Sequence, residues 1–200
     1  TRHTVYLQTQ FDKEPDLGNL VFLDWFANPA SKNGEPMYDK KAHLASYCLY
    51  QPAPEPMRTV VLANQFGKQK IIIGRPRCLL APSMKIEKDS KFPKKLDHYK
   101  VFQVLEGEPI NKEVKLEDQF DKTKVKITYP YAFAAPAEKR HEGRVFPVQN
   151  KKAHLIIYKI TPHKIEKSRI TSDQFGKHQL NFYQSILLAV PSIKLKWKEV

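Results

Sequence analysis

The 200-residue chain is strongly basic, with 34 Lys and Arg residues against 21 Asp and Glu residues and a formal net charge of +13. Its apolar content of 41% is enough to bury a hydrophobic core, which excludes general disorder. No apolar run approaches the ~18 residues that a spanning helix needs. We therefore expect no membrane span, and no uncleaved signal peptide at the start of the chain.

The charge predicts attraction to polyanions such as nucleic acid, acidic glycans, anionic lipid or an acidic protein. Most of the cations are dispersed lysines, whereas bases and phosphates are read best by the planar fork of arginine. We therefore expect no specific recognition of nucleic acid. Acidic residues gather near the N-terminus, at Asp12, Glu14, Asp16 and Asp24, so charge is unevenly distributed along the chain.

Short runs of β-branched and apolar residues, separated by turn residues, follow one another along the chain. We expect strands at residues 5–11, 43–47, 60–62, 71–73, 78–81, 98–102, 112–116, 124–128, 154–158 and 194–198. The runs 112–116 and 124–128 alternate polar and apolar residues, as half-buried antiparallel strands do. Sustained helical periodicity is absent from the sequence. It therefore predicts an all-β fold with little helix.

A repeat of about 55 residues runs through the chain. The dipeptide Gln-Phe occurs four times at intervals of 55, 54 and 55 residues, ending at Phe11, Phe66, Phe120 and Phe175. Each Phe is followed by a proline that has a lysine three residues later, at Pro29, Pro82, Pro136 and Pro191. In the last three units a histidine leads an apolar run upstream of Gln-Phe, at His43, His98 and His154. We therefore divide the chain into units 1–38, 39–92, 93–148 and 149–200.

These units either close as a single all-β repeat domain over residues 1–200 or pair into lobes 1–92 and 93–200. About four short antiparallel strands are expected in each unit, in a sandwich, barrel-like, propeller-like or closed repeat arrangement. Because proline lacks an N–H donor, Pro82, Pro136 and Pro191 are expected at strand ends or sheet edges. The lysine that follows each proline is expected to expose its charged head to solvent.

The first unit lacks the His-led strand of the other three, which leaves a strand position open. The C-terminal run 194–198 could fill this position within the chain, closing a ring, or in a neighbouring copy. An open strand position is also a template for strand addition by a partner. The candidate interface residues are Val5, Tyr6, Leu7, Leu195 and Trp197.

Several segments together resemble a known repeat family. They are Asn28-Pro29-Ala30-Ser31-Lys32-Asn33-Gly34-Glu35, Ala42-His43-Leu44, Asn64-Gln65-Phe66-Gly67, Pro82-Ser83-Met84-Lys85 and Leu96-Asp97-His98-Tyr99-Lys100. They are similar to an exported bacterial repeat domain of unknown function, whose alternating units read roughly NPxxKNGE, AHLxCYK, DQFG, VPxxK and LDHFKCYK. The resemblance covers nearly the whole chain. It implies an extracytoplasmic setting, in the periplasm, in another non-cytoplasmic compartment, at the cell surface or secreted. The family has no established enzymatic activity.

The resemblance also bears on the two cysteines. Units of that family commonly place one Cys beside the His-led strand and one before the proline, and this chain keeps such a pair only as Cys48 and Cys78. The family pattern implies that the two face each other on neighbouring strands and form a disulfide. Two buried free thiols are the alternative. Further ligands that zinc would need are absent from the neighbouring sequence.

The repeated histidines could in principle build a symmetric metal site. A hydrogen bond from one ring nitrogen to the backbone at the start of each strand explains their recurrence more simply. A catalytic group should occur once, whereas the notable residues here occur three or four times. The sequence also lacks a Gly-rich phosphate loop and the HExxH, GxSxG and CxxCH motifs. We therefore expect no catalytic residue, no metal site and no cofactor, and predict that the chain is not an enzyme.

The sequence is compatible with two candidate functions. The first is a non-catalytic structural or scaffolding subunit of a filament, layer or large envelope complex, whose partners are other proteins or copies of itself. The alternative is an extracytoplasmic module that binds an acidic glycan or another polyanion, through its lysines and aromatics such as Trp25, Phe26, Tyr129 and Tyr131. Binding to a polyanion should weaken steeply with salt, whereas assembly through strands should persist.

Overall fold

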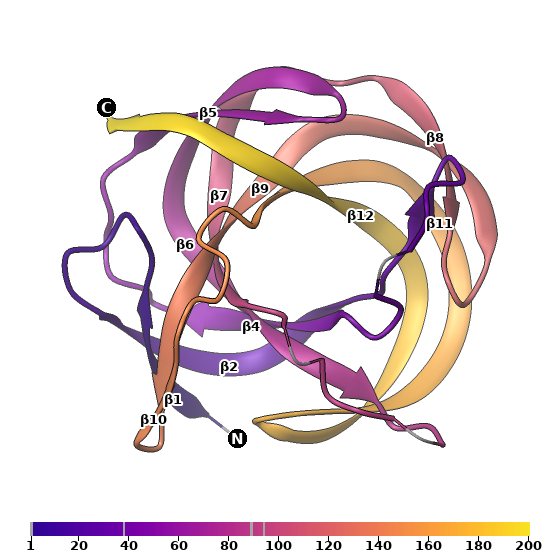
Figure 1. The fold of residues 1–200 in the computed structure, drawn as a ribbon, viewed down its shortest axis with the longest axis horizontal. Helices are drawn as coiled ribbons and strands as arrows, with labels where there is room; N and C mark the ends of the chain where they lie inside the picture. Colours follow the sequence, from indigo (N-terminus) through magenta and orange to yellow (C-terminus); the bar gives the residue numbers. More distant parts are fainter. Residues whose placement is uncertain (1, 38, 89, 94) are drawn as a thin grey trace.

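The computed structural model describes residues 2–37, 39–88, 90–93 and 95–200. These residues form twelve strands: β1 (His3–Gln8), β2 (Asp16–Ala27), β3 (Ser31–Lys32), β4 (His43–Tyr50), β5 (Arg58–Asn64), β6 (Gly67–Lys85), β7 (His98–Gly107), β8 (Lys112–Glu117), β9 (Lys122–His141), β10 (Arg144–Phe146), β11 (His154–Asp173) and β12 (Gly176–Glu199). All strands join in one antiparallel sheet that curves into a ring (Figure 1). The described ranges contain no helix, and so none that could cross a membrane. The all-β prediction is confirmed.

Units 2–4 are each built from three kinds of strand rather than four short ones, and unit 1 has only the last two kinds. A His-led strand (β4, β7 and the first part of β11) precedes a middle strand (β1, β5, β8 and the second part of β11). After the Gln-Phe turn comes a long strand (β2, β6, β9 and β12) of 12 to 24 residues. The long strands stay continuous because β-bulges shift their register, which lets them bend around the ring.

Strand pairing follows a cyclic rule. Each of the first three long strands pairs with the His-led strand of the next unit: β2 with β4, β6 with β7 and β9 with β11. The end of each long strand then reaches the middle strand two units further on. This second set comprises β3 with β8, β6 with β11, β9 with β1, and β12 with β5. Because the last two pairs return to the start of the chain, the four units close on one another (Figure 1).

The C-terminal strand therefore fills a different position from the expected one. Residues 193–199 of β12 pair with β5 in the second unit, not at the open position of the first. Strand β1 is already paired on both sides, by β2 and β9. Of the candidate interface residues, Val5 and Leu7 are consequently buried in the core and closed to a partner, while Tyr6, Leu195 and Trp197 keep exposed surface.

Pro82 and Pro136 lie within long strands that have neighbours on both edges, whereas Pro191 lies in a part of β12 that has a partner strand on one edge only among the described residues, as expected for a proline at a sheet edge. Pro82, Pro136 and Pro191 pair with the His-led strand of their own unit. On the opposite edge of β6 and β9, each proline falls between the end of one neighbouring strand and the start of the next. A residue without an N–H donor costs no ladder hydrogen bond at such a point. Pro29 lies likewise between β2 and β3.

Both faces of the long strands pack against apolar side chains. On β6, Leu79 and Ala81 join one cluster with Val5 and Leu7, whereas Cys78 and Leu80 alternate with them and join another. A third cluster gathers Phe11 with the middle strands and with Phe102 and other residues of units 3 and 4. The alternation expected for a half-buried strand holds in β8, where Val114 is buried between exposed Glu113 and Lys115.

Candidate functional site

The Gln-Phe turns share one local structure. Two residues before each Phe stands Thr9, Asn64, Asp118 or Asp173, whose side-chain oxygen accepts a hydrogen bond from the backbone N–H of that Phe at 2.7–3.1 Å. Such side chains satisfy the backbone of a tight turn locally. The residue before Gln is Asn or Asp in three units and carries this signal in the sequence, which our sequence analysis did not use.

Each repeat lysine contacts the Phe of the Gln-Phe turn in another unit. Each ammonium lies over the Phe ring of the following unit: Lys32 over Phe66, Lys85 over Phe120, Lys139 over Phe175 and Lys194 over Phe11, at 4.4–5.7 Å from the ring centroid. A desolvated cation–π contact contributes on the order of 1–2 kcal/mol. The expectation of solvent-exposed lysine heads is wrong, since the first three of these lysines are buried.

At two junctions the glutamine of the turn completes a clamp. Between units 4 and 1, Lys194 Nζ donates to Gln10 Oε1, and Gln10 Nε2 donates to His154 Nε2. Between units 3 and 4, Lys139 Nζ donates to Gln174 Oε1, and Gln174 Nε2 donates to His98 Nε2 at 2.9 Å. The side-chain amide thus joins the lysine and the histidine of the preceding unit.

The remaining two junctions differ from this pattern. Unit 1 has no His-led strand, and Lys32 instead forms an ion pair with Glu35 at 2.9 Å. Between units 2 and 3, Gln119 turns away and donates to Asn28 Oδ1 at 2.9 Å. His43 Nδ1 and Lys85 Nζ are buried there without a hydrogen-bond partner among the described residues.

The three histidines lie at separate junctions and are not brought together. His43 stacks on Phe26, His98 packs against Phe146, and His154 stacks on Phe133. The predicted backbone hydrogen bond occurs at His154, whose Nδ1 donates to the Lys152 carbonyl at 3.2 Å. His98 Nε2 instead accepts a hydrogen bond from Gln174, and His43 Nδ1 has no hydrogen-bond partner among the described residues.

An ion-pair cluster distinguishes unit 3 from the rest of the repeat. Lys100 is 1% exposed, and its Nζ lies 3.2 Å from Asp12 and 2.6 Å from both Asp16 and Glu55. The Glu55 Oε1 atom faces the ammonium outside hydrogen-bond alignment. Burial lowers the pKa of Lys100, but the carboxylates outweigh it and the net pKa is raised. The three acidic groups approach one another as metal ligands could, and here they surround an ammonium.

The cysteines lie directly opposite each other, Cys48 on β4 and Cys78 on β6. Both are free thiols in the structure, so the implied disulfide is not formed here. The pairing of β4 with β6 does place the two cysteines opposite each other, as the resemblance implied. Burial, with the neighbouring Cys78 and Asp24, raises the pKa of Cys48 to about 12. Burial also raises the pKa of Cys78. Neither has the depressed pKa of a reactive thiolate.

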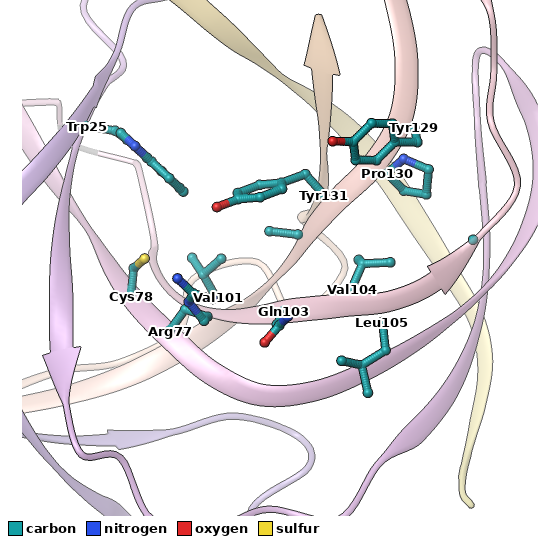
Figure 2. Close-up of a pocket in the computed structure, with 12 residues that line it drawn as sticks. Trp25, Arg77, Cys78, Val101, Gln103, Val104, Leu105, Tyr129, Pro130 and Tyr131 are labelled. Atoms are coloured by element: carbon teal, nitrogen blue, oxygen red, sulfur yellow. The ribbon is translucent and has the colours of Figure 1, made fainter.

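An aromatic pocket of about 240 Å³ opens beside Cys78. Figure 2 shows the tilted rings of Trp25 and Tyr131 side by side at the pocket, with Arg77 and Val101 nearby. The two aromatic ring centroids are 5.7 Å apart. A guanidinium beside aromatic faces suits a planar or ring-shaped ligand that carries negative charge.

An unpaired strand position separates β2 from β12. Residues 21–27 of β2 pair with β4 on one edge, and residues 176–192 of β12 pair with β11 on one edge. The other edge of each has no partner strand among the described residues. At the other three junctions the corresponding place is taken by β4, β7 or β11. The open strand position inferred from the sequence is therefore present in the fold.

A family model described as a repeat of unknown function, DUF7450, matches residues 43–191. The chain belongs to this family. The match begins at the first residue of β4 and ends at the last repeat proline. It therefore spans the three DUF7450 units that possess a His-led strand. No curated protein and no solved structure matches the chain.

The buried histidines of these DUF7450 units should make the fold sensitive to acid. Burial and the charge of Lys139 lower the pKa of His98 to about 3. Burial and Lys85 lower the pKa of His43 to about 4, opposed by the Ala27 backbone and Asp39. Both rings are neutral at pH 7, and the neutral ring of His98 can accept the hydrogen bond from Gln174 at its clamp.

We expect the free energy of unfolding to fall as the pH decreases from 6.5 to 4.5. In this range the unfolded chain protonates these histidines and the folded chain does not, which costs at most about 1.4 kcal/mol per pH unit and histidine. Urea unfolding at several pH values should show a shallower pH dependence for His98→Gln. His163→Gln, at a partly exposed ring, serves as the control. An unchanged slope in His98→Gln would contradict the assignment.

Proposed function

We propose that this chain is a non-catalytic scaffolding subunit that accepts a β-strand from a partner protein between β2 and β12. The partner is another subunit of a filament, layer or large envelope complex. The resemblance noted from the sequence supports a bacterial, extracytoplasmic setting for this assembly. The single observation that carries the proposal is the strand position left unfilled in a ring whose other three junctions are filled.

Burial along β12 supports strand addition. Leu188 is only half-buried and Ala189 is exposed, whereas their repeat equivalents in unit 3, Phe133 and Ala134, are fully buried. The difference arises because β9 has a strand on each side there, while β12 has one. Unpaired N–H and C=O groups beside half-buried apolar side chains form the surface on which an added strand gains both hydrogen bonds and burial.

The chain itself shows what kind of strand fits. The first five residues of β4 and of β7 are buried on both faces, beginning with a histidine and continuing with mainly apolar residues. A donated strand should therefore be apolar on both faces rather than alternating. The three His-led strands of this chain are already paired, so the donor is a different protein or a copy that has opened its own ring.

A peptide of residues 98–106 (HYKVFQVLE) tests this proposal directly. Fluorescence anisotropy of the labelled peptide should show saturable binding to the intact chain, and the binding should persist at high salt. A peptide with proline in place of Val101 and Gln103 should not bind, because it lacks N–H donors. In the chain, Ala189→Lys should weaken binding at least tenfold, and Ser168→Lys, on an exposed part of β11, should leave it unchanged.

Equal binding of the two peptides, or equal binding by the two chain variants, would refute strand addition. Light scattering over a concentration series adds a second readout. Growth of the purified chain into regular oligomers that survive high salt would indicate that copies donate strands to one another. A monomer that still binds the peptide would point to a different protein as donor.

A second candidate function rests on the aromatic pocket. Trp25, Tyr131 and Arg77 offer stacking surfaces and a fixed positive charge, which suits an acidic glycan or another polyanion. The excess of lysines over acidic residues favours the same ligands. Dependence on ionic strength separates the two functions, since this mode would weaken steeply with salt.

A further inference from the structure

The junction between units 2 and 3 lacks the amide that joins lysine and histidine at the two complete clamps. Gln119, at the position of Gln10 and Gln174, donates to Asn28 and is exposed. Lys85 and His43 keep their buried positions, but Lys85 Nζ and His43 Nδ1 have no hydrogen-bond partner among the described residues. The same two kinds of side chain are thus present without the group that connects them elsewhere.

The unpartnered ammonium lies in an unusual environment. Lys85 is 4% exposed, and its Nζ is 4.4 Å from the ring centroid of Phe120 and 5.9 Å from that of Phe26. Aromatic faces attract the charge, but they do not accept its N–H groups as an oxygen would. A buried ammonium without an acceptor oxygen is costly, so this position has a capacity for hydrogen bonding that the described chain leaves unused.

Lys85 and His43 line a cavity of about 470 Å³. Its volume lies in the range of ~300–1,000 Å³ typical of small-ligand sites. Five lysines and three acidic residues share its wall, so the balance of charge is positive: Lys40, Lys41, Lys85, Lys88 and Lys91 against Glu87, Glu117 and Asp118. Lys85 supplies the buried contact and the other lysines a surrounding positive potential.

We propose that this cavity binds the oxyanion group of a small ligand, a phosphate, sulfate or carboxylate. Lys85 Nζ donates to an oxygen of that group, in the place that the glutamine carbonyl takes at the two complete clamps. His43 Nδ1 is the second polar contact, for a further oxygen or hydroxyl of the ligand. The residues that line the cavity include none from the unpaired stretches 21–27 of β2 and 176–192 of β12, so this proposal and strand addition can fail independently.

The titration of Lys85 supports the same site. Burial lowers the pKa of Lys85 to about 8, with a further lowering by Arg169 and opposition from Glu87 and Asp118. The lysine therefore carries most of its charge at pH 7. An oxyanion bound against it should raise its pKa, because a nearby negative charge favours the ammonium form.

Isothermal titration calorimetry of the intact chain at pH 7 and constant ionic strength tests the proposal. The probes are sodium phosphate, sodium sulfate and sodium glucuronate. Tighter binding of phosphate or sulfate would assign a phosphorylated, sulfated or inorganic ligand, and tighter binding of glucuronate would assign an acidic sugar. Lys85→Met should weaken binding of the preferred probe at least tenfold. Lys139→Met, the equivalent lysine already bonded to Gln174, should change it less than twofold.

Lys85→Met should fold, because an apolar side chain of similar length replaces an unpaired buried charge. Circular dichroism checks this for both variants. A nuclear magnetic resonance titration of selectively labelled lysine side chains gives a second readout, in which the pKa of Lys85 should rise when the preferred probe is saturating. The proposal is overturned if no probe binds. It is equally overturned if Lys85→Met binds as well as the unsubstituted chain, or if the pKa of Lys85 stays unchanged at saturation.

Discussion

Replacing Lys100 by methionine should lower the free energy of unfolding by about 3–5 kcal/mol, the usual cost of removing one partner from a buried ion pair. Three carboxylates, those of Asp12, Asp16 and Glu55, converge on its ammonium. Arg58 contacts Glu55 at 2.7 Å and would be left as the nearby cation of this cluster. Arg58 still compensates Glu55, but the variant leaves the buried carboxylate of Asp12 without its ammonium partner, which is the expensive step. Urea unfolding monitored by fluorescence measures the loss.

Lys124→Met is the matched control for this experiment. Lys124 also forms an ion pair at 2.6 Å, with Glu113, but both side chains are more than half exposed. Exposed pairs contribute about 0.2–1 kcal/mol, so the control should lose little. A triple variant that adds Asp12→Asn and Glu55→Gln to Lys100→Met should recover part of the stability. Similar losses for Lys100→Met and Lys124→Met would show that the cluster does not stabilise the fold.

Phe11→Ala should also lower the free energy of unfolding by about 3–5 kcal/mol, through lost burial and the cavity left behind. Phe11 is 6% exposed and joins the core of the ring. Its ring centroid lies 5.6 Å from that of Phe102 and 5.0 Å from that of Trp197. It also contacts Arg58 and Lys194. The change therefore weakens the contacts between the first turn, unit 3 and the C-terminal strand.

Phe66→Ala provides a control at the same position of the repeat. Phe66 lies at the edge of the core and is only partly buried. Because the cost of truncation follows burial, we expect its loss to be smaller than that of Phe11→Ala by about 1 kcal/mol or more. Chemical unfolding of the two variants side by side gives the comparison. Equal losses would mean that the repeat position, rather than its local burial, decides the cost.

The sequence predicts the fold class and the repeat because both are periodic. The recurrence of Phe, Pro and His at constant intervals requires four similar units, and the short β-branched runs require strands. The same reasoning cannot predict which strands pair, since pairing a long strand with the middle strand two units away depends on how the chain curves. The burial of Lys85 and Lys139 escaped prediction for a related reason: their aromatic partners come from the next unit, far away in the sequence.

The Lys100 cluster cannot be predicted from the repeat because Lys100 does not recur in the other units. Its equivalents in units 2 and 4 are Ala45 and Ile156, both fully buried. A single charged residue at a position that is otherwise apolar was the available signal. The partners of that charge could not be found from the sequence, since Asp12 and Asp16 come from unit 1 and Glu55 from the segment before β5.

Pairing between units that are not neighbours gives the ring a folding behaviour unlike that of open repeat arrays. In an open array each repeat contacts only adjacent repeats, so a terminal repeat can unfold while the rest persists. Here β12 holds β5 and β9 holds β1, so each unit is anchored to the opposite one as well as to the next. Loss of one unit removes support from all the others, which favours a single cooperative transition. The same long-range pairing has to form before the ring is complete, which makes slow folding the cost of that cooperativity.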